Sequence, residues 1–300
     1  MRILAAIVTH NRQDLLSRCL DHLQAQKRAP DAILVINNAS TDGTVEMLQK
    51  RDIPFVTQEN VGSAGGWHRG IAHGLEDGFD AVWLMDDDGF PDAGALATLA
   101  PRLLSGVAAV SSVVVREDDP TRFVFPFPLL DGANLPVIFG SPRKVATLTD
   151  LTAIAPDGSY PFAHFFNGAL ISLAAVRKVG NVEQGFFMFG DEVDYFFRLR
   201  SAGMVFSVLN ALHFHPDVSQ RPYSAAKVYY YTKNTLILNQ RYFNAVWLRH
   251  AIAVAAVLGR TARRNGLGMV FSLICGSAAP GFYAAITRGL RGQVGKDFNG

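Results

Sequence analysis

The sequence contains little cysteine, with only Cys19 and Cys275 among its 300 residues. The two lie far apart and fit neither the spacing of a metal site nor that of a redox motif, which indicates a reducing compartment. The apolar run that follows Met1 is too short for a signal peptide, so we expect the chain to stay in the cytoplasm. The hydrophobic share of 49% excludes a disordered chain. The length of 300 residues, with two cysteines, excludes a small protein held together by disulfides.

Acidic residues are nearly absent from the last part of the chain. Residues 221–300 contain eleven Lys and Arg but one acid, Asp297, and so carry a charge of +10, while residues 1–220 carry −8. The near-neutral total of +2 hides this division. It predicts an acidic domain over residues 1–220 that binds metal and polar substrates. It also predicts a basic, apolar region over residues 221–300 that faces anionic lipid surfaces or lipid-linked substrates, with no nucleic acid as a partner.

Through the first part of the chain, short apolar runs alternate with helical patterns. Strands are predicted at 3–8, 33–36, 55–57 and 81–85, and helices at 14–24, 45–50 and 67–76. This alternation is typical of an α/β fold with a parallel sheet. Polar clusters follow the strands at 9–12, 37–38, 60–67 and 86–88. Because ligands of open α/β sheets bind at the carboxyl ends of the strands, we expect these clusters to form the site.

The middle and the end of the chain follow other patterns. Residues 116–165 show no clear period and are expected to line an acceptor site. A strand is predicted at 166–173, a helix at 191–202 and a strand at 204–209, followed by long helices at 225–248 and 249–264.

An uncharged run of 21 residues extends from 266 to 286. Its length suits a transmembrane helix, which needs about 20 apolar residues. Its four glycines, its proline at 280 and the arginines on both sides favour instead a helix pair that lies in the membrane interface. A true span, a soluble core and an oligomer contact remain as alternatives.

Three consecutive aspartates, Asp86, Asp87 and Asp88, follow a predicted buried strand. Their carboxylates repel one another at close range, so a structure that keeps them ionised needs a cation. Carboxylate oxygens with room for diphosphate oxygens suit Mg²⁺ or Mn²⁺. The alternative is a solvated acidic turn in which Asp88 caps a helix.

The glycine-rich turn at 60–67 does not have the spacing of a dinucleotide fingerprint and does not follow the first strand, so NAD is not expected as a ligand. Its glycines would still let a sugar or a phosphate approach the backbone. The alternative is a turn without a ligand.

Two further groups of residues could join the chemistry. Asp191 and Glu192 begin a predicted helix, where the helix dipole stabilises a carboxylate in the ionised form that a general base requires; plain N-capping is the alternative. His213 and His215 are expected to point to opposite sides, so that at most one of them joins a metal site. A lone histidine is more often structural.

Several motifs occur in the order found in the inverting glycosyltransferases of family 2, which the chain resembles over roughly residues 1–240. The motifs are Thr-His-Asn-Arg at 9–12, Val-Ile-Asn-Asn-Ala-Ser-Thr-Asp-Gly-Thr at 35–44, Asn-Val-Gly-Ser-Ala-Gly-Gly-Trp at 60–67, Trp-Leu-Met-Asp-Asp-Asp-Gly at 83–89, Phe-Asn-Gly-Ala at 166–169, Gly-Asp-Glu-Val-Asp-Tyr at 190–195 and His215-Pro216. Four motifs are similar to those of bacterial galactofuranosyltransferases: the glycine-rich loop at 60–67, Asp-Asp-Asp-Gly at 86–89, Asp-Asp-Pro-Thr-Arg at 118–122 and Gly-Asp-Glu-Val at 190–193.

The resemblance implies a GT-A fold, in which helices flank a mixed sheet, followed by a helical, membrane-associating extension. It also implies a UDP-sugar donor and a cation, Mn²⁺ or Mg²⁺, on its diphosphate. The implied metal ligands are Asp86, Asp88 and His215. The implied nucleotide-sugar contacts are Thr9, Arg12, Asn37, Asn60, Gly65, Gly66, Trp67 and Asp87. The family more often has Asp at position 37, which puts that contact in doubt.

The family commonly has Glu-Asp or Asp-Asp at 191–192, with the second acid as catalyst. The register therefore indicates Glu192 as the base, with Asp191 as a close rival. We expect direct, inverting displacement of UDP by a hydroxyl group of a polyprenyl-diphosphate-linked or other saccharide, in cell-wall or polysaccharide synthesis at the inner face of the cell membrane.

Three alternatives to this function differ in how well the sequence supports them. A rhamnosyl- or hexopyranosyltransferase on the same fold and a noncatalytic scaffold of a membrane assembly complex both remain open. A nucleotidyltransferase would usually carry a glycine-rich loop with Arg or Lys directly after the first strand, which Thr-His-Asn-Arg is not. The sequence leaves the oligomeric state open.

Overall fold

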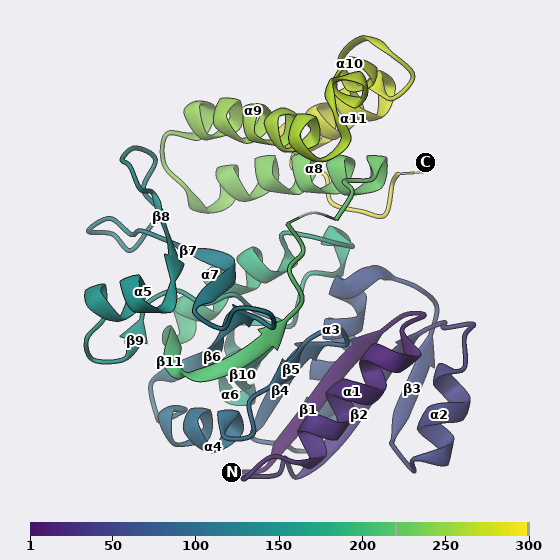
Figure 1. The fold of residues 1–300 in the computed structure, drawn as a ribbon, viewed down its shortest axis with the longest axis vertical. Coiled ribbons are helices and arrows are strands. Elements are labelled where there is room, and N and C mark those ends of the chain that lie inside the picture. Colours follow the sequence, from purple (N-terminus) through teal and green to yellow (C-terminus); the bar gives the residue numbers. More distant parts are fainter. Residues whose placement is uncertain (220, 299–300) are drawn as a thin grey trace. The chain divides into compact units, whose positions relative to one another are not determined.

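The computed structural model describes residues 1–219 and 221–298, and the chain divides into two compact units (Figure 1). The first unit comprises Met1–Val182 and Tyr195–Asp217, and the second comprises Glu183–Asp194 and Val218–Gly300. The segment Glu183–Asp194 thus groups with the later helices, whereas the predicted division at residue 220 places it in the first domain.

The first unit is built on a mixed sheet. Its strands are β1 (Ile3–Thr9), β2 (Ala32–Asn38), β3 (Phe55–Gln58), β4 (Ala81–Asp86), β5 (Phe90–Pro91), β6 (Val107–Arg116), β7 (Arg122–Pro128), β8 (Lys144–Thr147), β9 (Ser159–Tyr160), β10 (Asn167–Ser172) and β11 (Met204–His215). The main path runs β3-β2-β1-β4-β10-β6-β11-β5. β1 is parallel to β2 and to β4, whereas β10 is antiparallel to β4 and β6, which makes the sheet mixed.

Helices connect and flank these strands. They are α1 (Gln13–Gln24), α2 (Thr44–Lys50), α3 (Gly62–Glu76), α4 (Ala95–Leu99), the 3-10 turn η1 (Ala100–Arg102), α5 (Leu148–Ile154) and α6 (Leu173–Val179). The helix α7 (Asp191–Ala202) begins in the second unit and ends in the first. The α/β class and the flanked mixed sheet predicted from the sequence are therefore confirmed.

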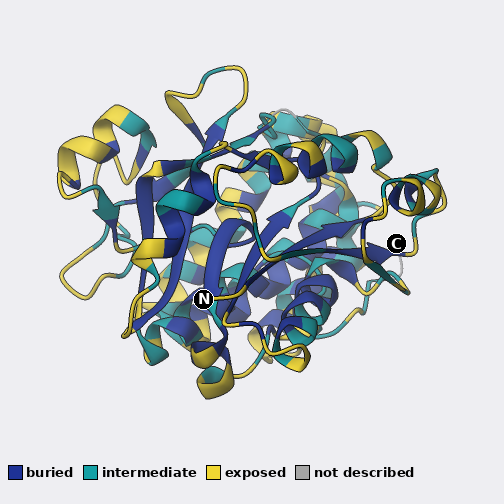
Figure 2. Ribbon diagram, turned by 90° about the horizontal axis from the view of Figure 1, so that it is seen from below, coloured by how far each residue is buried: buried dark blue, intermediate teal, exposed yellow. Residues whose placement is uncertain are grey.

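The central strands form because their residues are apolar without interruption. All seven residues of β1 are buried, as are the first five of β4, which is the pattern of parallel strands covered on both faces. Figure 2 shows this buried sheet in blue beneath more exposed helices and loops. Helix α3 packs closely on β1 because it presents glycine there: a methyl group at Gly70 would lie 3.1 Å from Cβ of Ala6.

Residues 116–165 contain β7, β8, α5 and β9, whose Phe123, Phe127 and Leu151 belong to a hydrophobic cluster that also includes residues of β6 and β11. The pairing of β7 with β8 shifts register between Arg122 and Phe127, so the period-two pattern of these strands is interrupted. This irregularity explains why the sequence shows no clear period here.

The second unit is helical. It contains the 3-10 turn η2 (Gln184–Phe186), the start of α7, α8 (Ala225–Tyr242), α9 (Val246–Asn265), α10 (Leu267–Cys275) and α11 (Ala279–Leu290). The predicted helix 225–248 is wrong at its end, because Ala245 adopts a left-handed conformation (φ 47°) that breaks the helix before α9.

The uncharged run 266–286 forms two helices rather than one. Among the described residues, no single helix is long and apolar enough to cross a membrane. The pair α10 and α11 passes that test of length and composition together, but the two helices meet at an angle of 68°.

Candidate active site

The carboxyl ends of β1, β2 and β4 bring the predicted polar clusters to one edge of the sheet. Thr9, at the end of β1, lies beside Asn37 of β2 in the register of the two strands. On the other side of β1, β4 ends at Asp86, whose backbone N–H donates to the carbonyl oxygen of Phe166 at 2.9 Å. The run of three aspartates therefore begins at the last residue of a strand that is held by hydrogen bonds on both sides.

Asp87 is buried and is bound by two of the residues predicted to contact the nucleotide. The hydroxyl of Thr9 donates to Asp87 Oδ2 at 2.8 Å, and Arg12 Nη1 donates to Asp87 Oδ1 at 2.9 Å. Burial raises the pKa of Asp87, and the charge of Arg12 partly offsets this effect. Thr9, Arg12 and Asp87 thus lie together as predicted, and both hydrogen bonds run through the carboxylate of Asp87.

Asp88 links Arg12 to His215. Arg12 Nη1 lies 3.1 Å from Asp88 Oδ2, and His215 Nε2 lies 3.0 Å from Asp88 Oδ1. The other ring nitrogen of His215, Nδ1, bonds the carbonyl oxygen of Pro216 at 2.7 Å. Burial lowers the pKa of His215, but the hydrogen bond and the charge of Asp88 outweigh it, so that the net shift is upward. This arrangement aims Nε2, the nitrogen a metal would take, at the aspartates.

The expectation that His213 and His215 point to opposite sides is wrong. Both lie on β11, and residues two apart on a strand share a face, whereas the intervening Phe214 packs on the hydrophobic cluster of the other face. His213 is fully buried beside Gly89. A Cβ at position 89 would collide with the imidazole ring of His213. Burial lowers the pKa of His213 to about 3, so it is neutral at pH 7.

The chemistry of this cluster fits a divalent cation. Burial, together with the charges of Asp88 and Asp87, raises the pKa of Asp86 to about 8, and a cation bound beside these carboxylates would favour its ionised form. Carboxylate oxygens and an imidazole nitrogen are suitable ligands for Mn²⁺. In residues 1–219 and 221–298, however, no three His, Cys, Asp or Glu side chains are arranged to hold a metal ion. To bind one, Asp88 and His215 would have to release each other.

The side chains of Asn37 and Asn60 shape their loops. Asn37 is fully buried; its Oδ1 accepts from the backbone N–H of Ser40 at 3.0 Å, and its Nδ2 donates to the hydroxyl of Thr57 at 3.2 Å. Asn60 Oδ1 accepts from the N–H of Gly62 at 3.1 Å, at the start of α3. Contact of either residue with a nucleotide stays a prediction.

Gly65, Gly66 and Trp67 are buried in the first turns of α3. A side chain at Gly66 would collide with Val8 of β1, and the Trp67 ring stacks on Phe166 with 4.7 Å between centroids. Packing against β1 therefore accounts for Gly66, the closeness of Val61 for Gly65, and stacking for Trp67, while a contact with the donor sugar or its diphosphate stays a prediction.

The predicted base belongs to the second unit, at the start of α7. Asp191 is buried, and Glu192 is partly exposed, with its Oε2 accepting from the backbone N–H of Gly190 at 2.8 Å. Gly190 has φ +92°, a conformation that favours glycine. The third acid of this turn, Asp194, is buried and accepts from Arg241 Nη1 and the Tyr242 hydroxyl of α8 at 2.8 and 2.7 Å, so its role is structural.

Sequence reasoning missed Asn234 of α8, which holds the loop before this turn. The two N–H groups of its side-chain amide are shared among three backbone carbonyl oxygens, those of Phe186, Met188 and Phe189, at 3.0, 2.9 and 2.7 Å. Phe187 and Phe189 have φ values of 62° and 60°, which bulky residues rarely adopt. Such strain persists only where neighbouring groups enforce it and is common next to active sites. No local signal in the sequence distinguishes Asn234 from the neighbouring polar residues Thr232 and Lys233, which are buried as well.

Comparisons with known proteins identify the family. The model of glycosyl transferase family 2 matches residues 5–153. Galactofuranosyltransferase GlfT1 of Mycobacterium tuberculosis is 37% identical over 224 residues, which cover 71% of this chain and 70% of that relative.

Two solved structures share the fold at low sequence identity. The mannosyltransferase PcManGT from Pyrobaculum calidifontis, in complex with GDP-Man and Mn²⁺, has a TM-score of 0.55 at 15% identity, covering 96% of this chain and 87% of that one. S. aureus TarS 1-349, in complex with UDP, has a TM-score of 0.55 at 13% identity, covering 97% and 81%. With the aspartates at the carboxyl edge of a mixed sheet, these findings show that the chain belongs to glycosyl transferase family 2 and has the GT-A fold.

Proposed function

We propose that this glycosyltransferase transfers galactofuranose from UDP-galactofuranose to a lipid-linked saccharide, with inversion at the anomeric carbon. The observation that carries its chemistry is the cluster of three aspartates at the end of β4, in which Asp87 and Asp88 are buried and Asp87 is bonded to Thr9 and Arg12. The donor sugar rests on the similarity to galactofuranosyltransferase GlfT1. The choice of a nucleoside-diphosphate sugar as the donor is supported by the structural neighbours, which were solved in complex with GDP-Man and with UDP.

Asp86, Asp88 and His215 would hold Mn²⁺ or Mg²⁺ in this enzyme. When bound, the cation neutralises charge that develops on the departing diphosphate. Arg12 keeps Asp87 and Asp88 oriented through its contacts at 2.9 and 3.1 Å, so one guanidinium positions two members of the cluster. The Mn²⁺ of the PcManGT complex supports this assignment of the metal.

Glu192 is the base in this proposal, and Asp191 is its rival. The first turn of a helix stabilises negative charge, and the Gly190 N–H fixes one oxygen of Glu192 at 2.8 Å. The other carboxylate oxygen is left to take the proton from an acceptor hydroxyl as that hydroxyl attacks the anomeric carbon. A single in-line displacement inverts the configuration at that carbon.

A panel of nucleotide sugars tests the donor. The full chain is incubated with Mn²⁺, a lipid-linked saccharide and UDP-galactofuranose, UDP-galactopyranose or dTDP-rhamnose, and the released nucleotide is measured. We expect UDP-galactofuranose to be turned over fastest. Faster turnover of either other donor would identify a hexopyranosyl- or rhamnosyltransferase on the same fold, and no turnover of any donor would favour a noncatalytic scaffold.

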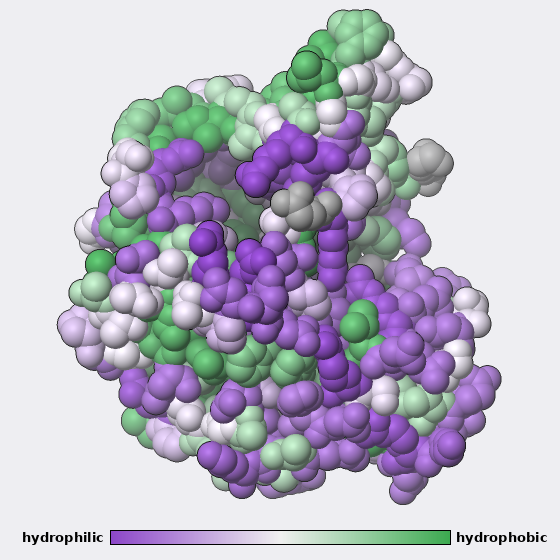
Figure 3. Space-filling model, in the orientation of Figure 1, coloured by the Kyte–Doolittle hydropathy of each residue, from purple (hydrophilic) through white to green (hydrophobic). Residues whose placement is uncertain are grey.

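We further propose that the second unit rests on the inner face of the cell membrane. Figure 3 shows apolar surface gathered over α10 and α11. On α10, Leu267, Phe271 and Ile274 follow a helical spacing on one face and are exposed by 77%, 68% and 40%, while Leu273 on the other face is buried. Arg263 and Arg264 lie at the end of α9 just before this helix. An exposed apolar face beside arginines suits an anionic lipid surface.

Sedimentation with vesicles tests this placement. We expect the chain to sediment with vesicles that contain anionic lipid and Phe271→Glu to remain in the supernatant. Phe139→Glu is the matched control, because Phe139 is 74% exposed but belongs to the first unit. Equal sedimentation of the two variants would contradict the assignment of α10 as the contacting helix.

A further inference from the structure

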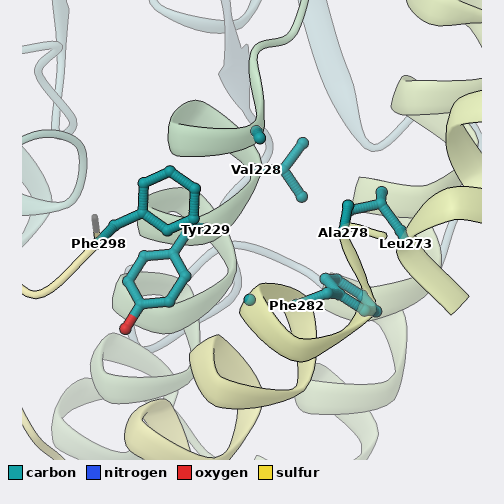
Figure 4. A pocket seen from close by; sticks show the side chains of 8 residues that line it. Val228, Tyr229, Leu273, Ala278, Phe282 and Phe298 are labelled. Atoms are coloured by element: carbon teal, nitrogen blue, oxygen red, sulfur yellow. The ribbon is translucent and has the colours of Figure 1, made fainter. Parts of the chain in front are cut away.

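The second unit contains an apolar cavity of about 160 Å³ between α8, α10 and α11 (Figure 4). Its lining residues are Ala225, Val228, Tyr229, Leu273, Ala278, Gly281, Phe282 and Phe298. The side chains are apolar except for Tyr229, whose hydroxyl accepts from Arg288 Nη1 at 3.0 Å. A closed apolar cavity of roughly this volume can bind a hydrocarbon the size of benzene. The cavity is therefore suited to a short stretch of hydrocarbon.

Two cations share one carboxylate next to Tyr229. Lys233, one turn further along α8, has no exposed surface; its Nζ donates to Gly295 O and Asp297 Oδ1, both at 2.7 Å. Arg288 of α11 pairs with Asp297 Oδ2 at 2.8 Å. A buried ammonium group is costly unless it is paired, so Lys233 requires an anion in this place.

Gly289 explains why these cations are so close. A Cβ at this position of α11 would lie 2.8 Å from the carbonyl oxygen of Lys233 and 3.0 Å from Cβ of Leu236, both on α8. The missing side chain lets the two helices touch, which places Arg288 beside Lys233. Helix packing therefore sets where the two cations lie.

The segment that neutralises the cations also lies against the cavity. The ring of Phe298 lies 4.9 Å from that of Tyr229, centroid to centroid, and lines the cavity. Asp297 and Phe298 therefore place a carboxylate on two cations and an apolar group against the adjoining cavity. A phosphorylated lipid combines the same two features, an anionic head and a hydrocarbon chain.

We propose that Lys233, Arg288 and the cavity bind the phosphorylated end of an isoprenoid, and that Asp297 and Phe298 occupy this site until the ligand displaces them. The choice of an isoprenoid rests on the proposed function, in which the acceptor is lipid-linked. The cations and the cavity by themselves favour an anionic group joined to a hydrocarbon, and the choice of a phosphate rests on the same proposed function. A cavity of this size admits about one isoprene unit.

Calorimetric titration of the full chain tests the site directly. The probes are farnesyl diphosphate, inorganic diphosphate, farnesol and short-chain phosphatidic acid, and a chelator is present to prevent metal-dependent binding of a diphosphate at Asp86–Asp88. We expect farnesyl diphosphate to bind about tenfold or more tightly than inorganic diphosphate or farnesol, because only it provides both a charged hydrogen-bonding partner and a hydrocarbon. Equal binding of inorganic diphosphate, or tighter binding of phosphatidic acid, overturns the assignment to an isoprenoid phosphate.

Three variants separate this site from general charge effects and from misfolding. Arg288→Gln is expected to weaken binding of farnesyl diphosphate about tenfold, the effect of losing a hydrogen bond between charged groups. Arg291→Gln, at the exposed end of the same helix, should leave it unchanged. Asp297→Asn should strengthen it several-fold, because the competing carboxylate is removed. Similar affinities for the two arginine variants, or no gain in Asp297→Asn, overturn the proposal.

These titrations contain no sugar donor, so their outcome is independent of the transfer reaction. If farnesyl diphosphate binds with the expected pattern but no donor is turned over, the site stands and the proposed function fails. If galactofuranose is transferred but farnesyl diphosphate does not bind, the site fails and the proposed function stands.

Discussion

Replacing Glu192 with glutamine is expected to lower the rate of sugar transfer by roughly two to four orders of magnitude, which is the contribution of a general base. The amide keeps the size of the carboxylate, and its oxygen can still accept from the Gly190 N–H that holds Glu192 at 2.8 Å. What it loses is the ability to take a proton from the acceptor hydroxyl. UDP binding should therefore be kept while turnover falls.

Steady-state transfer rates and UDP titrations on the same preparations would measure this separation. Glu183→Gln is the matched control, because Glu183 is an exposed acid of the same unit whose carboxylate likewise accepts from a nearby backbone N–H, that of Gly185. Its rate should stay normal. If Glu192→Gln retains a near-normal rate while Asp191→Asn is inactive, the base is Asp191.

The second large effect is expected from Asp88→Asn. Asp88 joins Arg12 to His215, and with Asp86 it supplies the carboxylates of the proposed metal site. Removing one of these charges should abolish the gain in UDP affinity that Mn²⁺ provides. It should also lower the catalytic efficiency by about two orders of magnitude or more, because a metal ion stabilises the departing charge by several kcal/mol.

Titration of UDP with and without Mn²⁺ distinguishes this loss from unfolding. Without the metal, Asp88→Asn and the unaltered chain should bind UDP alike, and thermal unfolding should show that the variant is folded. Glu46→Gln, an exposed acid in the first turn of α2, is the control for removal of an acidic charge. A UDP affinity of the unaltered chain that is indifferent to Mn²⁺ would contradict the proposed metal site.

The sheet and its polar edge were predictable from the sequence because they depend on local patterns. The apolar runs of β1 and β4 stand out, and polar residues follow each of them at 9–12 and 86–88. Parallel strands place their carboxyl ends at one edge, so convergence of Thr9, Arg12 and Asp87 follows from topology. No local pattern indicates that these side chains would bond to one another.

Other features depend on contacts between residues far apart in the chain. Asn234 bonds to the carbonyl oxygens of residues 186, 188 and 189, and this contact draws the loop before α7 into the helical unit. The full burial of Asn37 follows from its partner Thr57 on the neighbouring strand. The break after Tyr242 depends on the left-handed backbone of Ala245, a residue type that otherwise favours helices.

The positions of His213 and His215 are a different case, because strand periodicity alone determines that residues two apart share a face. Their common orientation was therefore available from the sequence once 204–215 was assigned to one strand. The structure places both beside the turn of the aspartates, with His215 bonded to Asp88 and His213 packed against Gly89.

The central claim is tested most directly by measuring the rate of transfer from UDP-galactofuranose under three conditions. The rate is measured with Mn²⁺, then after a chelator is added, and again after Mn²⁺ is restored. The proposed function predicts transfer of galactofuranose to a lipid-linked saccharide with inverted configuration, loss of transfer on chelation and its return with the metal. Transfer that continues undiminished in the chelator, or a complete lack of transfer from UDP-galactofuranose with the metal present, would contradict it.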